Sequence, residues 1–409
     1  MRVLHLNKFN YRRGGADAYV QDLAAMQRAA GHQVEVLATA HEDSLPATYS
    51  ALFPAYRELD PPPGPVATVR SAATMVWSRE AEAATAAVVA AFAPDVAHLH
   101  NVYHHLSPSV LRPLRRAGVP TVMTLHDYKL ACPSYQLLDH GKPCQACVGG
   151  SLTSAVRRRC KGGSLLASTL LATELGLHRR LHAYDHLGAL LCPSAFLISV
   201  MRRAGVYPER LRHVPNPVDA EVPVKQSPGG PVLFSGRLAA EKGVDTLVHA
   251  AALLRPVGAE PAVVVAGDGP ERAALEALAD RVAPGRVRFT GRLDKAAVQR
   301  QVAAAAVVAA PSRWYENQPL SVLEAHAAGV PVVATAMGGL PELVRAGVDG
   351  ALVAVDDPAA LAAALQGYLD DPVGALAAGA AGRERVLREH GAAEHLRSVD
   401  AAYAAAGAT

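Results

Sequence analysis

The sequence has no long hydrophobic run. Its longest unbroken apolar segment, residues 302–311, is much shorter than the roughly 18 residues that a membrane-spanning helix needs. Residues 1–13 are basic and contain no apolar segment of the signal-peptide kind. These absences argue against a helical membrane protein, and we expect a cytoplasmic location.

Charged residues are few, at 19% of the chain, whereas half of the residues are hydrophobic. Such a composition supplies enough apolar surface for sizeable cores and argues against a disordered chain. The 409 residues exceed one typical domain of roughly 100 to 200 residues. We therefore expect two globular domains.

Cysteine is also rare, and four of the five cysteines lie close together in sequence, at Cys132, Cys144, Cys147 and Cys160. The central pair, separated by two residues, has a common chelating spacing, and four thiolates would satisfy a tetrahedral structural zinc. The outer spacings match no standard zinc finger. A redox-active or oxidised pair and four ordinary thiols are therefore the alternatives.

Lysine is scarce, with 7 of the 40 basic residues, a bias that we attribute to a GC-rich bacterial genome. A lysine in an informative place consequently carries more weight. The net charge of +3 conceals an asymmetry, because residues 1–215 carry +8 and the remainder −5. The basic half fits either an anionic partner or a solvated surface.

Short apolar segments alternate with helical periodicity along both halves of the chain. Strands that alternate with helices are parallel and joined by right-handed crossovers, so the pattern predicts an α/β protein with two doubly wound, Rossmann-like sheets. A proline-rich segment at 61–65 predicts a loop. The predicted strands are 3–6, 34–39, 96–100, 120–125, 189–192, 211–214, 232–234, 263–266, 287–290, 307–310, 330–335 and 351–353; the predicted helices include 16–29, 81–92, 107–116 and two that begin at 244 and 271.

Two Pro/Gly-rich segments, 215–217 and 227–230, interrupt this alternation and are typical of an interdomain linker. We assign residues 1–215 to an N-terminal domain with a cysteine-rich insertion at about 130–163, residues 216–230 to the linker and residues 231–390 to a C-terminal domain. Residues 391–409 are expected to form a helix that packs back on the N-terminal domain. Where two such sheets face each other, ligands bind between the carboxyl ends of their strands.

Glycines and cations occupy the expected strand ends. Gly14 and Gly15 begin the first helix, where backbone N–H groups can approach an anion, although such a pair is also typical of an ordinary turn. Arg237 and Lys242 follow the first strand of the second half and would compensate a diphosphate; two solvated cations are the alternative. The turn at Gly267 brings backbone close to a ligand.

The segment 311–324 contains two glutamates. Pro319 in the first turn of a helix places Glu316 in the preceding loop and Glu324 about one turn into that helix. Carboxylates accept paired hydrogen bonds from neighbouring hydroxyls. The two glutamates can therefore address a sugar ring and a ribose.

Together these motifs resemble the retaining glycosyltransferases of family 4, which have the GT-B fold of two Rossmann-like domains facing across a cleft. The resemblance covers nearly the whole chain. It is carried by residues 13–16, 98–101, 104–108, 126–128, 214–216, 236–237, 242–243 and 267–269, and by the two glutamates with seven residues between them.

The resemblance implies a role for each matching residue. The N-terminal domain would be the acceptor side and the C-terminal domain would bind a UDP- or GDP-linked sugar. Glu316 would hold the transferred sugar and His126 would lie beside the reaction centre. Donor-binding residues would be Gly14, Gly15, Arg237, Lys242, Gly267, Asn317, Leu320, Ser321 and Glu324, and acceptor-side residues His104, His105, Asp127 and Tyr128.

The chain departs from the commoner family pattern after the first glutamate, where Asn317-Gln318-Pro319-Leu320 replaces Gly-Phe-Gly-Leu. Pro319 has no N–H, so one backbone donor to phosphate is missing. We expect the Leu320 and Ser321 amides to carry that contact. The side-chain amides of Asn317 and Gln318 are candidates for reaching the donor sugar.

The expected function is transfer of a sugar, with retention of configuration, to a glycan, lipid-linked or natural-product hydroxyl. No metal is expected to be required for catalysis, and no nucleic acid is expected as a partner. A non-hydrolysing sugar-nucleotide epimerase and a catalytically idle carbohydrate-binding protein are the alternatives. Basic residues of the first half would either dock the protein on an anionic membrane or form solvated helix faces; they are Arg112, Arg115, Arg116, Arg157, Arg158, Arg159, Arg179 and Arg180.

Overall fold

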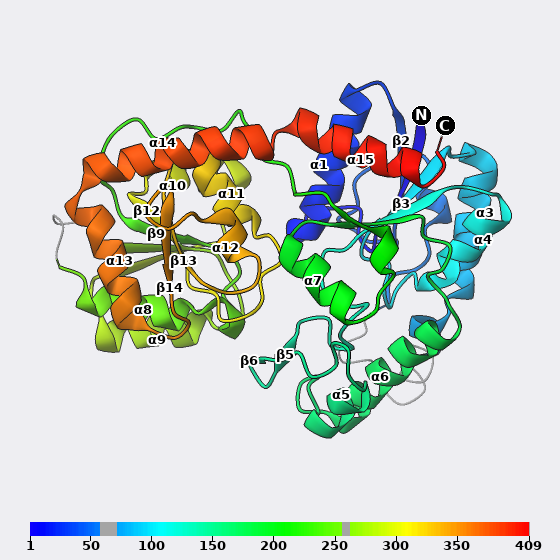
Figure 1. The fold of residues 1–409 in the computed structure, drawn as a ribbon, viewed down its shortest axis with the longest axis horizontal. Coiled ribbons are helices and arrows are strands. Elements are labelled where there is room, and N and C mark those ends of the chain that lie inside the picture. Colours follow the sequence, from blue (N-terminus) through cyan, green and yellow to red (C-terminus); the bar gives the residue numbers. More distant parts are fainter. Residues whose placement is uncertain (58–71, 256–261, 409) are drawn as a thin grey trace. The chain divides into compact units, whose positions relative to one another are not determined.

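The computed structural model describes residues 1–57, 72–255 and 262–408, which form two compact units (Figure 1). Unit 1 comprises Met1–His140, Gln145–Pro215 and His395–Thr409, and unit 2 comprises Gly141–Cys144 and Asn216–Glu394. The proline-rich segment 61–65 lies outside the described residues. None of the helices within the described ranges is both long and apolar enough to cross a membrane.

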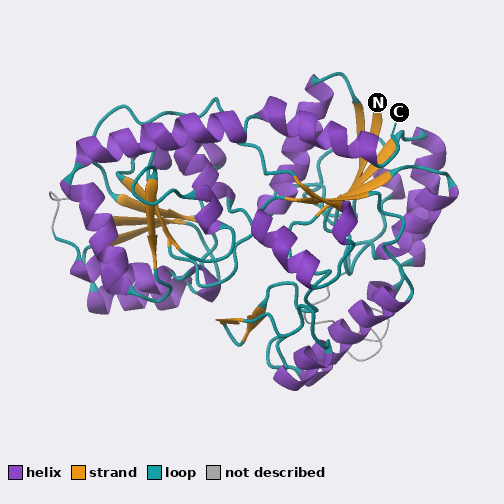
Figure 2. Cartoon of the chain, in the orientation of Figure 1, coloured by secondary structure: helices purple, strands orange, loops and turns teal. Residues whose placement is uncertain are grey.

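Unit 1 is built on a six-stranded parallel sheet in the order β2-β1-β3-β4-β7-β8. Helices flank the sheet (Figure 2), so its central strands are apolar and buried, as expected of a parallel sheet covered on both faces. The strands are β1 (Arg2–Leu6), β2 (Gln33–Leu37), β3 (Val96–Leu99), β4 (Thr121–Thr124), β7 (Ala189–Cys192) and β8 (Leu211–His213); the helices include α1 (Gly15–Ala29), α3 (Arg79–Phe92), α4 (Leu111–Arg116) and α7 (Ala195–Arg203).

Two parts of unit 1 differ from the sequence prediction. The predicted helix at 107–116 divides into a 3-10 turn, Pro108–Val110, and α4; Ser107, with a positive φ of 59°, begins the turn because its hydroxyl accepts from Ser109 N–H. The cysteine-rich insertion, for which Gly141, Gly149 and Gly150 predict a loop, is more regular than that. It contains helix α5 (Thr153–Arg158) and the paired short strands β5 (Leu138–Asp139) and β6 (Lys142–Pro143), of which β6 lies in the segment Gly141–Cys144 of unit 2; the capped helix α6 (Leu165–Arg180) follows it.

Unit 2 repeats the architecture with a six-stranded parallel sheet in the order β11-β10-β9-β12-β13-β14. Alternate residues of β9 enter two apolar cores, one on each face of the sheet. The strands are β9 (Val232–Ser235), β10 (Val263–Ala266), β11 (Val287–Gly291), β12 (Val307–Ala310), β13 (Val332–Thr335) and β14 (Gly350–Val353); the helices are α8 (Val244–Leu253), α9 (Arg272–Val282), α10 (Lys295–Ala304), α11 (Leu320–Ala327), α12 (Leu340–Leu343), α13 (Pro358–Asp370) and α14 (Pro372–Glu389).

The prediction of two doubly wound parallel sheets is thereby confirmed. In each sheet the strand order reverses direction at one point, between β9 and β12 in unit 2 and between β1 and β3 in unit 1. Loops diverge at such a switch point, and ligands of open α/β sheets bind there. The topology therefore directs attention to the segments that follow these four strands.

The last helix, α15 (Ala392–Ala405), contributes its residues from His395 onward to unit 1. Figure 1 shows it as the red helix beside α1. Tyr403 is fully buried in the core of unit 1, and its hydroxyl accepts a hydrogen bond of 2.9 Å from Gln27 Nε2 of α1. The C-terminal helix is thus an integral layer of unit 1.

Candidate active site

The switch point of unit 2 brings a lysine and a glutamate together. Lys242 ends the short 3-10 turn Ala240–Lys242 after β9, and Glu316 lies in the loop after β12. Lys242 Nζ donates to Glu316 Oε1 over 2.6 Å, and Ser312 Oγ donates to the same oxygen, also over 2.6 Å. Two residues separated by 74 positions thus form one polar group at the carboxyl end of the sheet.

Glu316 is a buried anion stabilised by its neighbours. Burial alone would raise the pKa of its carboxyl, but the charge of Lys242 and hydrogen bonds from Lys242 and Ser312 outweigh burial and hold that pKa below its ordinary value. The Lys242 ammonium also lies 5.2 Å from the centre of the Trp314 ring, within the range of a cation–π interaction. The carboxylate is therefore ionised at neutral pH.

Arg237 and Lys242 follow the same strand but have different surroundings. Arg237 is paired with Glu241 through its guanidinium, and its side chain remains 56% exposed. Lys242 is much less exposed, at 21%. Sequence reasoning placed both cations at this strand end and missed Glu241 as the partner of Arg237, although the spacing of four residues was a readable signal.

Glycines shape the backbone around Glu316. A Cβ atom at Gly338, which has φ +63°, would lie 2.4 Å from the Glu316 carbonyl oxygen, and one at Gly339 would lie 1.9 Å from the Asn317 carbonyl oxygen. Gly339 N–H donates to the Glu316 carbonyl over 2.7 Å. Only glycine fits these positions, so this loop after β13 supports the glutamate loop after β12.

Gly267 has the same steric character. It follows β10 with φ +153°, and a Cβ atom there would lie 1.8 Å from the carbonyl oxygen of Gly236. The predicted close approach at Gly267 is therefore one between two protein loops. It packs the segment that carries Arg237.

Helix α11 begins at Leu320, and Pro319 is its N-cap instead of part of its first turn. The N–H groups of Leu320 and Ser321 precede the first intrahelical hydrogen bonds, as at any helix N-terminus, and this end carries partial positive charge. Glu324 is the fifth residue of the helix, and Asn317 lies in the loop before it. The segment thus presents its N–H groups at the switch point.

Gln318 has a different role from the one expected from the sequence. Its side chain is buried, and its Oε1 accepts a hydrogen bond of 2.5 Å from Asn216 N–H. The Gln318 carbonyl also accepts from Asn216 Nδ2 over 3.4 Å. Gln318 therefore fixes the first linker residue onto unit 2 instead of reaching toward a donor sugar.

At the switch point of unit 1, Gly14 is the N-cap of α1 and has extended backbone. A Cβ atom at Gly14 would meet no protein atom within 4 Å, so protein packing does not demand glycine there. Asn7, at the end of β1, donates to Asp17 Oδ1 over 2.9 Å and accepts from Asn101 N–H over 3.2 Å. Gly15 is exposed at the start of the same helix. Open space at a helix N-terminus suits an anion.

Lys8 was not foreseen. It follows β1, its Nζ lies 4.7 Å from the centre of the Phe9 ring, and burial together with the charge of Arg13 lowers its pKa to about 8. The scarcity of lysine was a signal that could have drawn attention to it. A cation thus accompanies Gly14 in this unit.

His126 and Asp127 follow β4. His126 Nε2 lies 3.2 Å from Nδ1 of His100, and burial lowers the pKa of His126 to about 3. Burial raises the pKa of Asp127 to about 6, although the N–H and charge of Lys129 oppose this shift. A neutral imidazole and a weakly acidic carboxyl therefore lie side by side in the sequence at this strand end.

One of the remaining acceptor-side candidates, His104, lies beside a buried ion pair. Lys129 Nζ donates to Glu174 Oε2 of α6 over 2.5 Å, and His104 Nε2 lies 3.8 Å from the same oxygen. His105 Nε2 donates to the Arg57 carbonyl over 3.0 Å. Tyr128 is buried, with its ring edge-on to Phe196. His104 is thus near the group, while His105 and Tyr128 have structural partners.

Three of the four clustered cysteines have identified neighbours within unit 1. All five cysteines lie in the described chain, and none forms a disulfide. Cys147 and Cys160 pack in a small apolar cluster with Ala155 and Ala172, Cys160 Sγ donates to the Ala155 carbonyl, and Cys132 Sγ lies 3.3 Å from Ser134 Oγ. Among described residues, the group with metal-ligand spacing is His5, His98 and His100. Cys147 and Cys160 are therefore packed thiols, and the structural zinc expected from the four cysteines stays a prediction.

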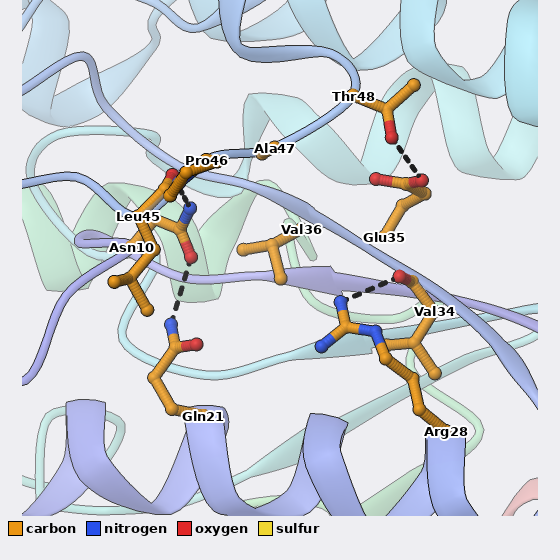
Figure 3. A pocket seen from close by; sticks show the side chains of 10 residues that line it. All are labelled: Asn10, Gln21, Arg28, Val34, Glu35, Val36, Leu45, Pro46, Ala47 and Thr48. Carbon is orange, nitrogen blue, oxygen red and sulfur yellow. Dashed lines mark hydrogen bonds between the residues drawn. The ribbon is translucent and has the colours of Figure 1, made fainter.

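A cavity of about 460 Å³ lies in unit 1 beside α1 and β2 (Figure 3). Its polar side chains already bond within the protein: Thr48 donates to Glu35 over 2.6 Å, and Arg28 donates to the Val34 carbonyl over 2.8 Å. It contains none of the predicted site residues. We therefore do not assign it to the active site.

Comparison with known families agrees with this geometry. Residues 13–222, about half of the chain, match the family described as Glycosyltransferase Family 4, and residues 230–371 match Glycosyl transferases group 1. The chain belongs to the group 1 glycosyltransferases, and its two sheets are those of the GT-B fold.

Two relatives illustrate the similarity. The 2-deoxystreptamine glucosyltransferase of Streptomyces kanamyceticus is 34% identical over 284 residues, which cover 68% of each chain. The D-inositol 3-phosphate glycosyltransferase of Frankia alni is 33% identical over 388 residues, which cover 90% of each chain.

Solved structures establish the fold. The sucrose-phosphate synthase from Thermosynechococcus elongatus superposes with a TM-score of 0.71 at 23% identity, over 98% of both chains. The Anabaena protein HepE, solved in complex with UDP, gives 0.69 at 19% identity over 99% of this chain and all of that one.

Proposed function

We propose that the protein is a retaining glycosyltransferase of family 4 that transfers a sugar from a nucleoside-diphosphate sugar to a hydroxyl group. The contact between Lys242 and Glu316 at the switch point of unit 2 carries this proposal. A lysine held by an ionised glutamate supplies a fixed positive charge beside a carboxylate that can accept hydroxyl hydrogen bonds. That pairing suits a ligand with a diphosphate and a sugar.

The donor side of the mechanism follows from the charges around this contact. Lys242, Arg237 and the N-terminus of α11 would stabilise the negative charge that develops on the departing diphosphate, an electrostatic task that requires no metal ion. Glu316 would orient the transferred sugar, and Glu324, one turn into α11, would bind the ribose hydroxyls. UDP is the first nucleotide to test, because the similar HepE structure was solved with it.

Retention is consistent with a front-face reaction, in which an oxygen of the leaving phosphate accepts the acceptor's proton and no protein base is needed. In a double displacement a carboxylate would instead attack the anomeric carbon. Asp127 would be the candidate nucleophile in unit 1, and with its pKa raised by burial to about 6 it is mostly ionised at neutral pH. We propose the front-face course, with His126 beside the reacting sugar, because that course needs no protein nucleophile.

The acceptor class is proposed from the acceptors named for two similar proteins. Two similar proteins are named for 2-deoxystreptamine and D-inositol 3-phosphate, and both compounds are polyhydroxylated rings. We propose an acceptor of this hydroxyl-rich, natural-product or glycan kind. A panel of UDP- and GDP-sugars with these two compounds, glycans and lipid-linked sugars would identify the pair by the release of nucleoside diphosphate.

The decisive experiment compares Lys242→Ala with Lys295→Ala. Lys295 is an exposed lysine of the same unit, paired on the surface with Asp219. Loss of Lys242 should lower transfer by about 100-fold or more, as for other groups that stabilise developing charge, and the Lys295 variant should retain normal transfer. Equal turnover in both variants would overturn the assignment. Release of an epimerised free sugar without acceptor would identify an epimerase instead, and nucleotide-sugar binding without turnover an idle binding protein.

Membrane contact is a separate proposal for the basic residues of unit 1. Two of these arginines have ionic partners: Arg112 pairs with Glu82 at 3.2 Å and Arg158 with Asp139 at 2.8 Å. The exposed Arg115, Arg116, Arg157, Arg159 and Arg180 remain candidates. Salt-sensitive cosedimentation with anionic vesicles, and none with neutral vesicles, would support contact with a membrane, whereas equal recovery with both would contradict it.

A further inference from the structure

Three histidines in the core of unit 1 have no part in the mechanism described above. His5 lies on β1, His98 lies on β3, and His100 immediately follows β3; all three are fully buried. Buried polar side chains are destabilising unless hydrogen-bonded. The partners of these three side chains form one continuous chain of hydrogen bonds across the unit.

One end of this chain is His126. His126 Nε2 lies 3.2 Å from His100 Nδ1, and His100 Nε2 lies 3.0 Å from His5 Nδ1. The other nitrogen of His5, Nε2, lies 2.7 Å from Gln27 Oε1 on α1. Three imidazoles thus connect the strand end after β4 to helix α1.

The chain continues through the C-terminal helix. Gln27 Nε2 donates to the Tyr403 hydroxyl over 2.9 Å, and that hydroxyl lies 2.8 Å from His98 Nδ1. His98 Nε2 lies 2.7 Å from Thr124 Oγ1 at the end of β4. Tyr403 of α15 is therefore the link between two histidine segments.

The far end is anchored on the backbone. Thr124 hydrogen-bonds the Tyr19 hydroxyl, whose oxygen lies 3.1 Å from His395 Nε2. His395 Nδ1 lies 2.7 Å from the carbonyl oxygen of Pro215, the last residue of unit 1 before the linker. His395 is the first residue of α15 that belongs to unit 1.

The carbonyl fixes the direction of every hydrogen bond. A carbonyl only accepts, so His395 carries its hydrogen on Nδ1 and accepts from Tyr19 on Nε2. Each following group then accepts once and donates once: Thr124 donates to Tyr19, His98 to Thr124 and Tyr403 to His98. On the other side, Gln27 donates to Tyr403, His5 to Gln27, His100 to His5 and His126 to His100. A single donor-to-acceptor direction along the chain therefore gives every group its hydrogen-bond partners.

We propose that the C-terminal helix sets the tautomer of His126, holding its hydrogen on Nε2 and leaving Nδ1 as an acceptor. Tyr403 and His395 act as positioning residues through this chain. The proposal concerns the protonation pattern of a histidine that neither residue touches. Only its kinetic consequence rests on the proposed function, in which His126 lies beside the reacting sugar.

The charge state of the histidines agrees with a chain of hydrogen bonds that sets the His126 tautomer. Burial lowers the pKa of His5 to about 4 and that of His126 to about 3, and it also lowers those of His98 and His100. All four are therefore neutral near pH 7, where an imidazole has one donor and one acceptor nitrogen. A metal ion would need bare nitrogens, whereas both ring nitrogens of His5, His98 and His100 already have protein partners.

Nitrogen NMR of the histidine side chains tests the proposal directly. In the full chain labelled with 15N-histidine, two-bond and three-bond couplings distinguish the Nε2–H from the Nδ1–H form, and His126→Asn assigns the signals. We expect His126 to be a single Nε2–H tautomer. In Tyr403→Phe, Gln27 loses its acceptor and can rotate, so His126 should become a mixture of the two forms.

Tyr184→Phe is the matched control, because Tyr184 is another buried tyrosine of unit 1 that takes no part in the chain of hydrogen bonds. It should leave His126 in one tautomer. If wild-type His126 carries hydrogen on Nδ1, or if Tyr403→Phe leaves a pure Nε2–H form in a folded protein, the proposal is overturned. Zinc that copurifies with the wild type and disappears in His98→Phe would identify a metal site instead.

A second pair of variants separates positioning from simple destabilisation. His395→Gln retains an acceptor for Tyr19, whereas His395→Phe removes it. We expect His395→Gln to restore the His126 tautomer that His395→Phe scrambles, even if both lower the melting temperature. Equal tautomer mixtures in the two variants would show that His395 does not act on His126 through the chain of hydrogen bonds.

Kinetics of sugar transfer then test whether the His126 tautomer affects turnover. Because turnover scales with the fraction of molecules in the competent tautomer, Tyr403→Phe should lower kcat about two- to tenfold, with the donor KM unchanged. An equal decrease of kcat in Tyr184→Phe would show that the decrease in Tyr403→Phe does not come from the His126 tautomer. If no transferase activity exists in the wild type, the proposed function fails while the NMR result on the tautomer stands independently.

Discussion

The Lys242 ammonium lies 2.6 Å from the Glu316 carboxylate, and the two residues follow the neighbouring strands β9 and β12. The contact joins the two segments that diverge from the switch point of unit 2. Each side chain therefore sets the electrostatic state of the other.

Replacing Lys242 with Met should raise the pKa of Glu316. The wild-type pKa is below its ordinary value because Lys242 and other donors outweigh burial. Without the ammonium, burial has less opposition, so the carboxyl should take up a proton at higher pH. Carbon NMR of the labelled glutamates measures this shift. A Glu316 pKa that is unchanged in the variant would contradict the electrostatic role of Lys242.

The pKa shift of Glu316 also determines how the free energy of unfolding depends on pH. A lowered folded-state pKa gives stability that is present above the unfolded value near 4.5 and is lost as pH falls through the folded value. The difference in unfolding free energy between the wild type and Lys242→Met should therefore be largest at neutral pH and shrink as pH falls below about 4.5. Urea unfolding at a series of pH values provides the measurement.

Gly338→Ala should displace the Glu316 loop. The added Cβ would lie 2.4 Å from the Glu316 carbonyl oxygen, so backbone must shift. Gly347→Ala is the control, because Gly347 has a similar φ of +76° but no atom within 4 Å of its Cβ position. The control should lose about 1 to 2 kcal/mol from its positive φ alone. Gly338→Ala should lose more, and its kcat should fall; equal effects would show that the close approach is unimportant.

Asp127→Asn should become relatively more stable than the wild type as pH rises. Burial raises the folded-state pKa of Asp127 from 3.8 to about 6, so its favourable contribution is present below the unfolded value and is lost as pH rises through about 6. Linkage gives about 1.4 kcal/mol for each unit of pKa shift. The difference in unfolding free energy should grow between pH 4 and 7 and then level off; a flat difference would contradict the shift.

Lys129→Met should be strongly destabilising because it leaves Glu174 buried without its cation. Lys129 and Glu174 are 2.5 Å apart, with side chains at most 2% exposed. Removing one partner of such a pair typically costs about 3 to 5 kcal/mol, whereas replacing both with apolar groups is often neutral. The double variant Lys129→Met, Glu174→Leu should therefore recover much of the loss in urea unfolding. An equal loss in both variants would show that the pair is not electrostatically coupled.

The strands were predictable because each is a short apolar run bounded by turn residues. Val263–Ala266 and Val307–Ala310 were predicted with their observed bounds. Helix α6 was missed because its buried face includes Glu174 and His178 beside Leu171 and Leu175, which obscures the apolar periodicity. Polar residues buried by tertiary partners give no local signal of burial.

In the candidate site, too, some residues were predictable from the sequence and others were not. Sequence indicated Lys242, Glu316 and Glu324 through their places at strand ends and helix starts. It gave Gln318 a role in donor binding, although Gln318 bonds to Asn216, 102 residues away. The pairing of Arg237 with Glu241 was within reach of the sequence, whereas the support of Glu316 by Gly338 required the fold.

By itself, the sequence determined two doubly wound sheets and the residues that follow their strands, because alternating apolar runs and Gly/Pro breaks are local properties. Only the tertiary structure decided the partners: the ionised state of Glu316 depends on Lys242, and the direction of the histidine chain depends on a carbonyl at Pro215 and a hydroxyl on the last helix. Hydrogen bonds and pKa shifts depend on distances of a few ångströms. Chain folding, not sequence spacing, sets those distances.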